Sequence, residues 1–221
     1  MTAGVDGFGA ATLDAVRRCL GTRPRRRTVG VTLLLALLAG EVLGAAVKPG
    51  DLTFAAVSDP VQSLMSVTVP LLGILVVRDR ERLLSTLWAV VLLAAGLGAF
   101  GAVWCAAVTT RGSAPDPWRH AATIALGSVL VQVLAVLVGT GLGRLVRPVP
   151  LAFLATFVPL LLWLALSAAP GSAEDWLTPY PTARHLLSGD MSRPAWPQWL
   201  TVFLIWGVAL NVLGAKRPWQ T

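Results

Sequence analysis

The sequence predicts an all-α, polytopic membrane protein with six transmembrane helices, and two observations carry this prediction. First, 55% of the 221 residues are apolar and only 13% are charged, whereas a soluble domain has about 25% charged residues. Second, six stretches reach or approach the roughly 20 apolar residues that a helix needs to cross a bilayer. The mean hydropathy of +0.71 agrees with this pattern. The excess of apolar side chains is therefore expected to face lipid.

The six predicted spans follow one another along residues 30–214, which we interpret as one transmembrane domain. The second span is short, so its helix can begin earlier, between Leu52 and Val57, with Asp59 and Pro60 as a break or a helix start. The third is longer than a span requires, and we expect its first turns to lie in the membrane surface as a separate short helix. The predicted spans cover residues 31–47, 61–77, 83–109, 121–143, 149–169 and 197–214.

The polar ends of the chain are expected to lie on one side of the membrane, because six crossings return it to the side where it began. Residues 1–29 form a predicted cytoplasmic segment, and residues 215–221 form a short cytoplasmic tail. Within the first segment, residues 10–20 place apolar side chains at helical spacing. This pattern predicts an amphipathic helix lying in the plane of the membrane surface.

The largest predicted external segment, residues 170–196, separates the fifth and sixth spans. Its tryptophan and tyrosine side chains are typical anchors at a membrane interface, and its prolines interrupt regular structure. Within it, Thr182 is expected to cap a short helix through Leu187 that ends at Gly189.

Basic residues divide unequally between the two sides of this topology. The positive-inside rule therefore predicts that both termini are cytoplasmic, in the plasma membrane. The predicted cytoplasmic side holds Arg17, Arg18, Arg23, Arg25, Arg26, Arg27, Arg78, Arg80, Arg82, Arg144, Arg147, Lys216 and Arg217. The predicted external side holds Lys48, Arg111, Arg119, Arg184 and Arg193.

Several chemistries are excluded by the motifs that the sequence lacks. A Walker phosphate loop needs Gly-Lys-Ser/Thr, and neither Lys48 nor Lys216 stands in that context. The chain also has no GxSxG, HExxH or CxxC motif, so we predict that it is not an enzyme and binds no metal. Because the basic residues lie at the ends of apolar runs, the net charge of +7 predicts no nucleic-acid partner. Cys19 and Cys105 fall on opposite sides of the membrane and are expected to be free thiols.

Three polar residues fall inside predicted spans. Glu41 lies near the centre of the first span, where an ionised acid costs about 2.5–3.5 kcal/mol. Gln132 in the fourth span or Asn211 in the sixth can hydrogen-bond it across a helix interface. Glu41 is therefore either a functional site or a protonated, purely structural contact between helices. Gly40-x-x-x-Gly44 and Gly139-x-x-x-Gly143 present small faces that allow helices to approach closely.

The layout as a whole resembles the membrane subunit of type-2 ABC exporters. The segment VVRDRERLLSTLW, residues 76–88, is similar to the charged loop that follows the second span in that family, and SAEDWLTPYPTARHLLSGDMSRPAWPQWL resembles its external helical region. The resemblance implies ATP-driven export through a pathway formed with a second permease subunit. It also implies a separate ATPase subunit, which would hold ATP and Mg²⁺, so this chain itself needs no cofactor.

The resemblance also implies where the ATPase would couple to this chain. In the family, the in-plane helix and the loop after the second span contact the ATPase. Carried onto this sequence, the loop charges are Arg78, Asp79, Arg80, Glu81 and Arg82, and Arg78–Leu87 would form the coupling helix. Two alternatives remain open: an integral membrane accessory or assembly protein without an ATPase, and an ion-coupled carrier or intramembrane enzyme. A carrier would need an acid such as Glu41.

Overall fold

The computed structural model describes residues 16–17, 19–78, 83–168 and 171–216, and all of its regular elements are helices. Six of them are long and apolar enough to cross a membrane, which confirms the predicted number of spans. The chain is therefore an integral membrane protein. The principal elements are α2 (Arg23–Ala46), α3 (Phe54–Val77), α4 (Leu83–Thr109), α5 (Ala121–Leu145), α6 (Val149–Ala155), α7 (Val158–Ser167), α8 (Ala173–Leu177), α9 (Pro179–Ser188), α10 (Ala195–Val202), the π-helix η2 (Phe203–Ala209) and α11 (Leu210–Lys216).

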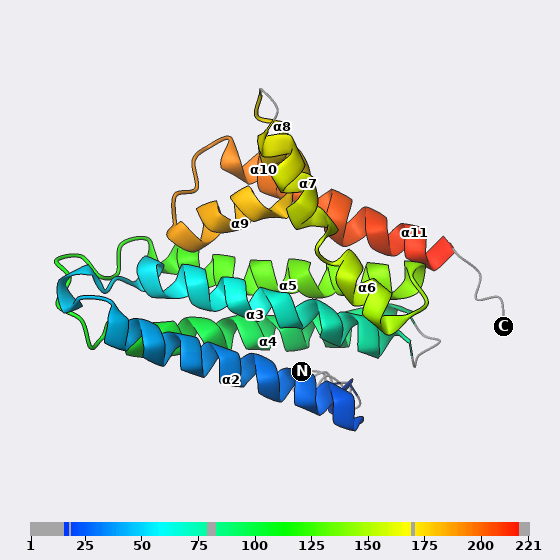
Figure 1. Cartoon of the computed structure of the whole chain (residues 1–221), viewed down its shortest axis with the longest axis horizontal. Coiled ribbons are helices and arrows are strands. Elements are labelled where there is room, and N and C mark those ends of the chain that lie inside the picture. Colours follow the sequence, from blue (N-terminus) through cyan, green and yellow to red (C-terminus); the bar gives the residue numbers. More distant parts are fainter. Residues whose placement is uncertain (1–15, 18, 79–82, 169–170, 217–221) are drawn as a thin grey trace, which may run out of the picture.

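Helices α2 to α5 run side by side, while the last two spans lie obliquely on one flank of α5 (Figure 1). The start of α2 and the ends of α3, α5 and α11 lie at the same end of this bundle (Figure 1). We call it the basic end, because Arg25, Arg78, Arg144, Arg147 and Lys216 lie there. The opposite end, which holds the connections 47–53 and 110–120, is called the loop end.

The most extensive packing joins α3 and α5, and glycine makes it possible. A Cβ atom on Gly73 would lie 2.5 Å from the Val136 carbonyl oxygen, and one on Gly139 would overlap the Pro70 carbonyl. Gly143 faces the backbone of Ile74 in the same way. The predicted small face of Gly139 and Gly143 is thus the surface on which the α3 backbone rests directly.

The first two spans differ from their predicted limits. Helix α2 begins at Arg23, so the RPRRR run forms its first turn instead of preceding it; Pro24 fits there because the first helical N–H groups have no intrahelical acceptor. Helix α3 begins at Phe54, where the Thr53 side chain accepts a hydrogen bond from the Ala56 N–H at 3.2 Å. Pro60 lies inside α3 and does not break it.

Helix α4 is continuous over 27 residues, about 40 Å. Residues 83–87 are its first turns and continue directly into the span, so they do not form a helix separate from α4 as we expected. Residues 79–82 lie outside the described residues, as do residues 10–15 and 18 of the predicted in-plane helix.

The fifth and sixth spans are both irregular. Span five is divided into α6 and α7 because Pro159 cannot donate to the carbonyl of Ala155 and its ring displaces that turn. Span six contains the π-helical segment η2 between α10 and α11. Both features lie at mid-span, where a neighbouring helix must satisfy the displaced backbone groups.

The segment between spans five and six forms two short helices, of which α9 folds back onto α3 and α5 while α8 packs against α7 and α10. Helix α9 begins at Pro179, with Thr178 as its N-cap, so the predicted start at Thr182 is wrong. Its predicted end is confirmed, since Gly189 adopts the left-handed conformation with φ 80°. Leu186 and Leu187 of α9 are buried against α5, whose Gly127 contacts the Leu186 backbone.

We predict that Gly139→Ala destabilises the protein by about 1–3 kcal/mol, because the added methyl group would displace the α3 backbone. Gly96→Ala on α4 is the matched control, since nothing lies within 4 Å of a Cβ at that position. It should be neutral or stabilising, as alanine is the better helix former. Thermal unfolding of both variants in detergent measures the difference, and equal melting temperatures would contradict the close crossing.

Candidate functional site

Gln62 and Gln132 form a buried polar pair between α3 and α5. The Gln132 Nε2 atom donates to the main-chain oxygen of Gln62 and to its side-chain Oε1, both at 2.9 Å. Gln62 Nε2 in turn donates to the Gly98 carbonyl of α4 at 3.1 Å. Both glutamines are 0% exposed, so these bonds link three spans where water does not compete.

Asn211 performs a similar role between α11 and α5. Its amide nitrogen donates to the carbonyls of Leu137 and Gly207, both at 2.7 Å. Its Oδ1 accepts from the Thr140 hydroxyl at 2.8 Å. The amide therefore fixes the sixth span to α5 just beyond its π-helical segment, where the regular hydrogen-bond pattern is displaced.

Glu41 pairs with Arg111, and not with Gln132 or Asn211 as we expected. The guanidinium donates two hydrogen bonds, Nη1 to Oε2 at 2.8 Å and Nη2 to Oε1 at 3.0 Å. Helix α2 ends at Ala46, so Glu41 lies only about 8 Å from its loop end and not near its centre. The two side chains are about half exposed, at 51% for Glu41 and 50% for Arg111.

The surroundings of this ion pair fix its geometry. Arg111 also lies over the Trp104 ring, 5.9 Å from its centroid. Gly40 provides the space for Trp104, because a Cβ there would meet the indole. The hydrogen bond from Arg111 to Glu41 raises the pKa of Arg111 above its usual value, so the guanidinium stays charged. The ion pair joins α2 to the end of α4, which is the arrangement of a structural contact between two helices.

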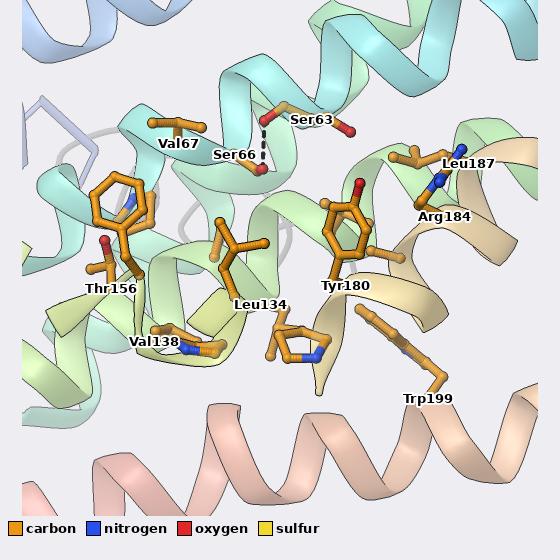
Figure 2. A pocket seen from close by; sticks show the side chains of 18 residues that line it. Ser63, Ser66, Val67, Leu134, Val138, Thr156, Tyr180, Arg184, Leu187 and Trp199 are labelled. Carbon is orange, nitrogen blue, oxygen red and sulfur yellow. Dashed lines mark hydrogen bonds between the residues drawn. The ribbon is translucent and has the colours of Figure 1, made fainter. Parts of the chain in front are cut away.

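A cavity of about 330 Å³ opens between α3, α5, α7 and α9 (Figure 2). Small side chains leave the space: Ser63 and Ser66 on α3, Ala135 on α5 and Ala183 on α9. The break in span five supplies another wall, because it turns Thr156 and Phe157 toward α5. The cavity has the size and the mostly apolar lining of a small-molecule site.

Polar groups collect at the part of the cavity nearest the loop end. Figure 2 shows the Tyr180 hydroxyl directed toward α3 and the Arg184 side chain beside Leu187. Arg184 Nε lies 3.9 Å from an Asp59 carboxylate oxygen, and its guanidinium carbon lies 5.9 Å from the Tyr180 ring centroid. The first distance is too long for a hydrogen bond, so this is a weak ion pair.

The sequence did not identify Asp59, Tyr180 and Arg184 as a group. Asp59 was interpreted as part of a helix boundary, Tyr180 as an interface anchor and Arg184 as an external charge. The available signal was the spacing of Tyr180 and Arg184, which is that of residues on one helical face. It carried no information on which face of α9 meets α3.

Of the predicted coupling residues, only Arg78 is described, and it lies at the basic end. Arg78 ends α3, and its Nη2 donates to the Val146 carbonyl after α5 at 3.1 Å. Asp79, Arg80, Glu81 and Arg82 lie outside the described residues. Among the described residues there is no cluster of histidine, cysteine or acidic side chains suited to a metal, and Cys19 and Cys105 are buried and form no disulfide.

We predict that Gln132→Leu lowers the stability by about 1–3 kcal/mol, because two oxygens of Gln62 lose their buried donor. Gln198→Leu, at a partly exposed position on α10, is the control for removing an amide. Thermal unfolding in detergent should separate the two variants. Equal effects would mean that the buried pair contributes no more than an ordinary glutamine.

The chain was compared with models of protein families, with curated proteins and with solved structures, and no match was found in any of the three. The geometry and the sequence pattern therefore carry the functional argument for this integral membrane protein.

Proposed function

We propose that the chain is the transmembrane subunit of an ATP-driven exporter, working with a separate ATPase chain. The observation that carries this proposal is the pair α8–α9 between spans five and six. Helix α9 folds onto α3 and α5 away from the basic end, and α8 packs beside it against α7 and α10 (Figure 1), which supports the external helical region that the type-2 exporter layout has between its last two spans. The six spans and the charged segment after the second support the same layout.

The proposed mechanism couples the segment 79–82 to the core of the bundle. An ATPase docked on this segment would push against α3, whose end Arg78 is tied to the end of α5 through Val146. The close glycine contact between α3 and α5 would carry that displacement as a rigid unit. The ATPase would hold ATP and Mg²⁺, so this chain would supply the pathway and no catalytic group.

A second permease subunit completes the proposal. Span five and span one are the least buried of the six within the chain. Span one leaves Val31, Leu34, Leu38 and Val42 exposed along one face. Lipid or a second membrane subunit can cover such faces, and a pathway between two subunits would use them. An accessory protein without an ATPase is the competing function.

The proposed orientation places the basic end in the cytoplasm, by the distribution of lysine and arginine. We predict that single cysteines at positions 80 and 147 are protected from a membrane-impermeant maleimide in intact cells, while one at position 185 is labelled. Cys19 and Cys105 are first replaced by serine. Labelling at position 80 before cell lysis would reverse the topology and remove the ATPase docking site.

The coupling proposal predicts that reversing the charges of Arg80, Glu81 and Arg82 detaches or uncouples an ATPase without unfolding the spans. Several exposed charge pairs together set docking register, although each contributes little alone. The experiment is purification in mild detergent with mass-spectrometric identification of bound proteins and an ATPase assay. The matched control reverses Lys48, Asp51 and Arg119 at the loop end.

Two results would contradict the exporter role. One is that the unaltered protein brings no ATPase with it. The other is that the reversed variant inserts normally and still binds a fully active ATPase, in which case the charges only set the topology of the chain.

A further inference from the structure

The cavity between α3, α5, α7 and α9 is charged at one end and mostly apolar along the rest, where the Ser63, Ser66 and Thr156 hydroxyls are the polar side chains of the lining. Arg184 and Tyr180 line the part of the cavity nearest the loop end. Arg184 lies there near Asp59, which is about 8 Å along α3 from the start of that helix. From Ser63 to Pro70, the α3 wall continues about 10 Å toward the basic end. Opposite that stretch, the wall is formed by aliphatic side chains of α5 such as Leu134 and Val138 (Figure 2). The cavity therefore has one charged end and one mostly apolar end.

Arg184 has donors available at the charged end. Among the described residues, Arg184 approaches an Asp59 carboxylate oxygen at 3.9 Å through Nε and lies near the Tyr180 ring. A guanidinium offers five N–H donors, and a phosphate accepts two of them side by side. At 62% side-chain exposure, Arg184 can reach a ligand from within the cavity mouth.

Part of the cavity opening lies toward the membrane, because two of its lining residues are exposed on membrane spans. Val67 of α3 and Leu160 of α7 both line the cavity, and they are 43% and 37% exposed. A ligand that enters here approaches from the acyl region. Its chain would meet the apolar wall while its head stays at the level of Arg184.

We infer that this cavity binds one acyl chain of an anionic phospholipid, with the phosphate of its headgroup held by Arg184 and the Tyr180 hydroxyl. The acyl chain lies along α5 and displaces only solvent or disordered lipid. Arg184 selects for net negative charge, and the Asp59 carboxylate, 3.9 Å from its Nε, keeps the guanidinium beside the cavity. This inference does not depend on the exporter proposal, because it concerns a cavity within one chain.

The test titrates purified protein in maltoside micelles with dioleoyl phosphatidylglycerol and, separately, dioleoyl phosphatidylcholine, and counts bound lipid by native mass spectrometry. We expect one phosphatidylglycerol bound at least about fivefold more tightly than phosphatidylcholine, as for one arginine near an anionic headgroup. Arg184→Gln should abolish this preference, and Arg184→Lys should keep part of it. Arg119→Gln, an exposed arginine away from the cavity, should change nothing.

A second pair of variants tests the acyl position. Ala183→Leu fills the cavity and should weaken both lipids at least about fivefold, while Ala173→Leu on the exposed start of α8 should not. If Ala183→Leu lowers the melting temperature, Ala183→Val replaces it. Glycerol 1-phosphate at millimolar concentration should fail to displace the lipid, because the headgroup alone lacks the chain.

Four results would each overturn the inference, and the first three concern the lipid titrations. These are equal binding of the two lipids by the unaltered protein, a preference that survives Arg184→Gln, and binding unaffected by filling the cavity. Displacement by glycerol 1-phosphate would do so as well, since it would reveal a free-phosphate site with no acyl component.

Discussion

The direct contact of the α3 and α5 backbones is the constraint on which the other features depend. Gly73, Gly139 and Gly143 remove the side chains that would hold these helices apart. Lipid provides no hydrophobic force between helices, so close packing and hydrogen bonds must supply the attraction. At the same crossing distance the amide of Gln132 reaches both oxygens of Gln62. Shape and polar pairing therefore stabilise one interface together.

Spans five and six pack differently from α3 and α5. Pro159 divides span five, and a π-helical segment interrupts span six, so neither packs along its full length against α5. Asn211 and the Trp206 indole, which donates to the Leu177 carbonyl at 2.8 Å, hold span six at separate points. An irregular helix in a membrane needs such partners for its displaced backbone groups. The cavity forms where these spans diverge from the tight α3–α5 pair.

The polar residues inside the spans divide by environment. Gln62, Gln132 and Asn211 are neutral amides in fully enclosed positions, where each donor finds a carbonyl. Glu41, a charged residue of span one, lies nearer the loop end and is about half exposed. Arg184 lies outside the spans, on α9, with its side chain 62% exposed. This division follows from the cost of an ion, which is far greater than that of a satisfied amide in a low-dielectric interior. It also leaves Arg184 able to act on a ligand.

Composition and run length alone determined the fold class and the number of spans, because the bilayer imposes a length on every crossing. The glycine spacing at 139 and 143 correctly indicated a close helix contact. The helix start at Arg23, with Pro24 in its first turn, and the start at Phe54, with its Thr53 cap, are features that hydropathy does not report. The break in span five required the placement of Pro159 against its neighbours. Which side chains meet was decided only in three dimensions. Glu41 found Arg111, and Asp59, Tyr180 and Arg184 came together around a cavity, because helix rotation and the return of α9 onto α3 set those contacts.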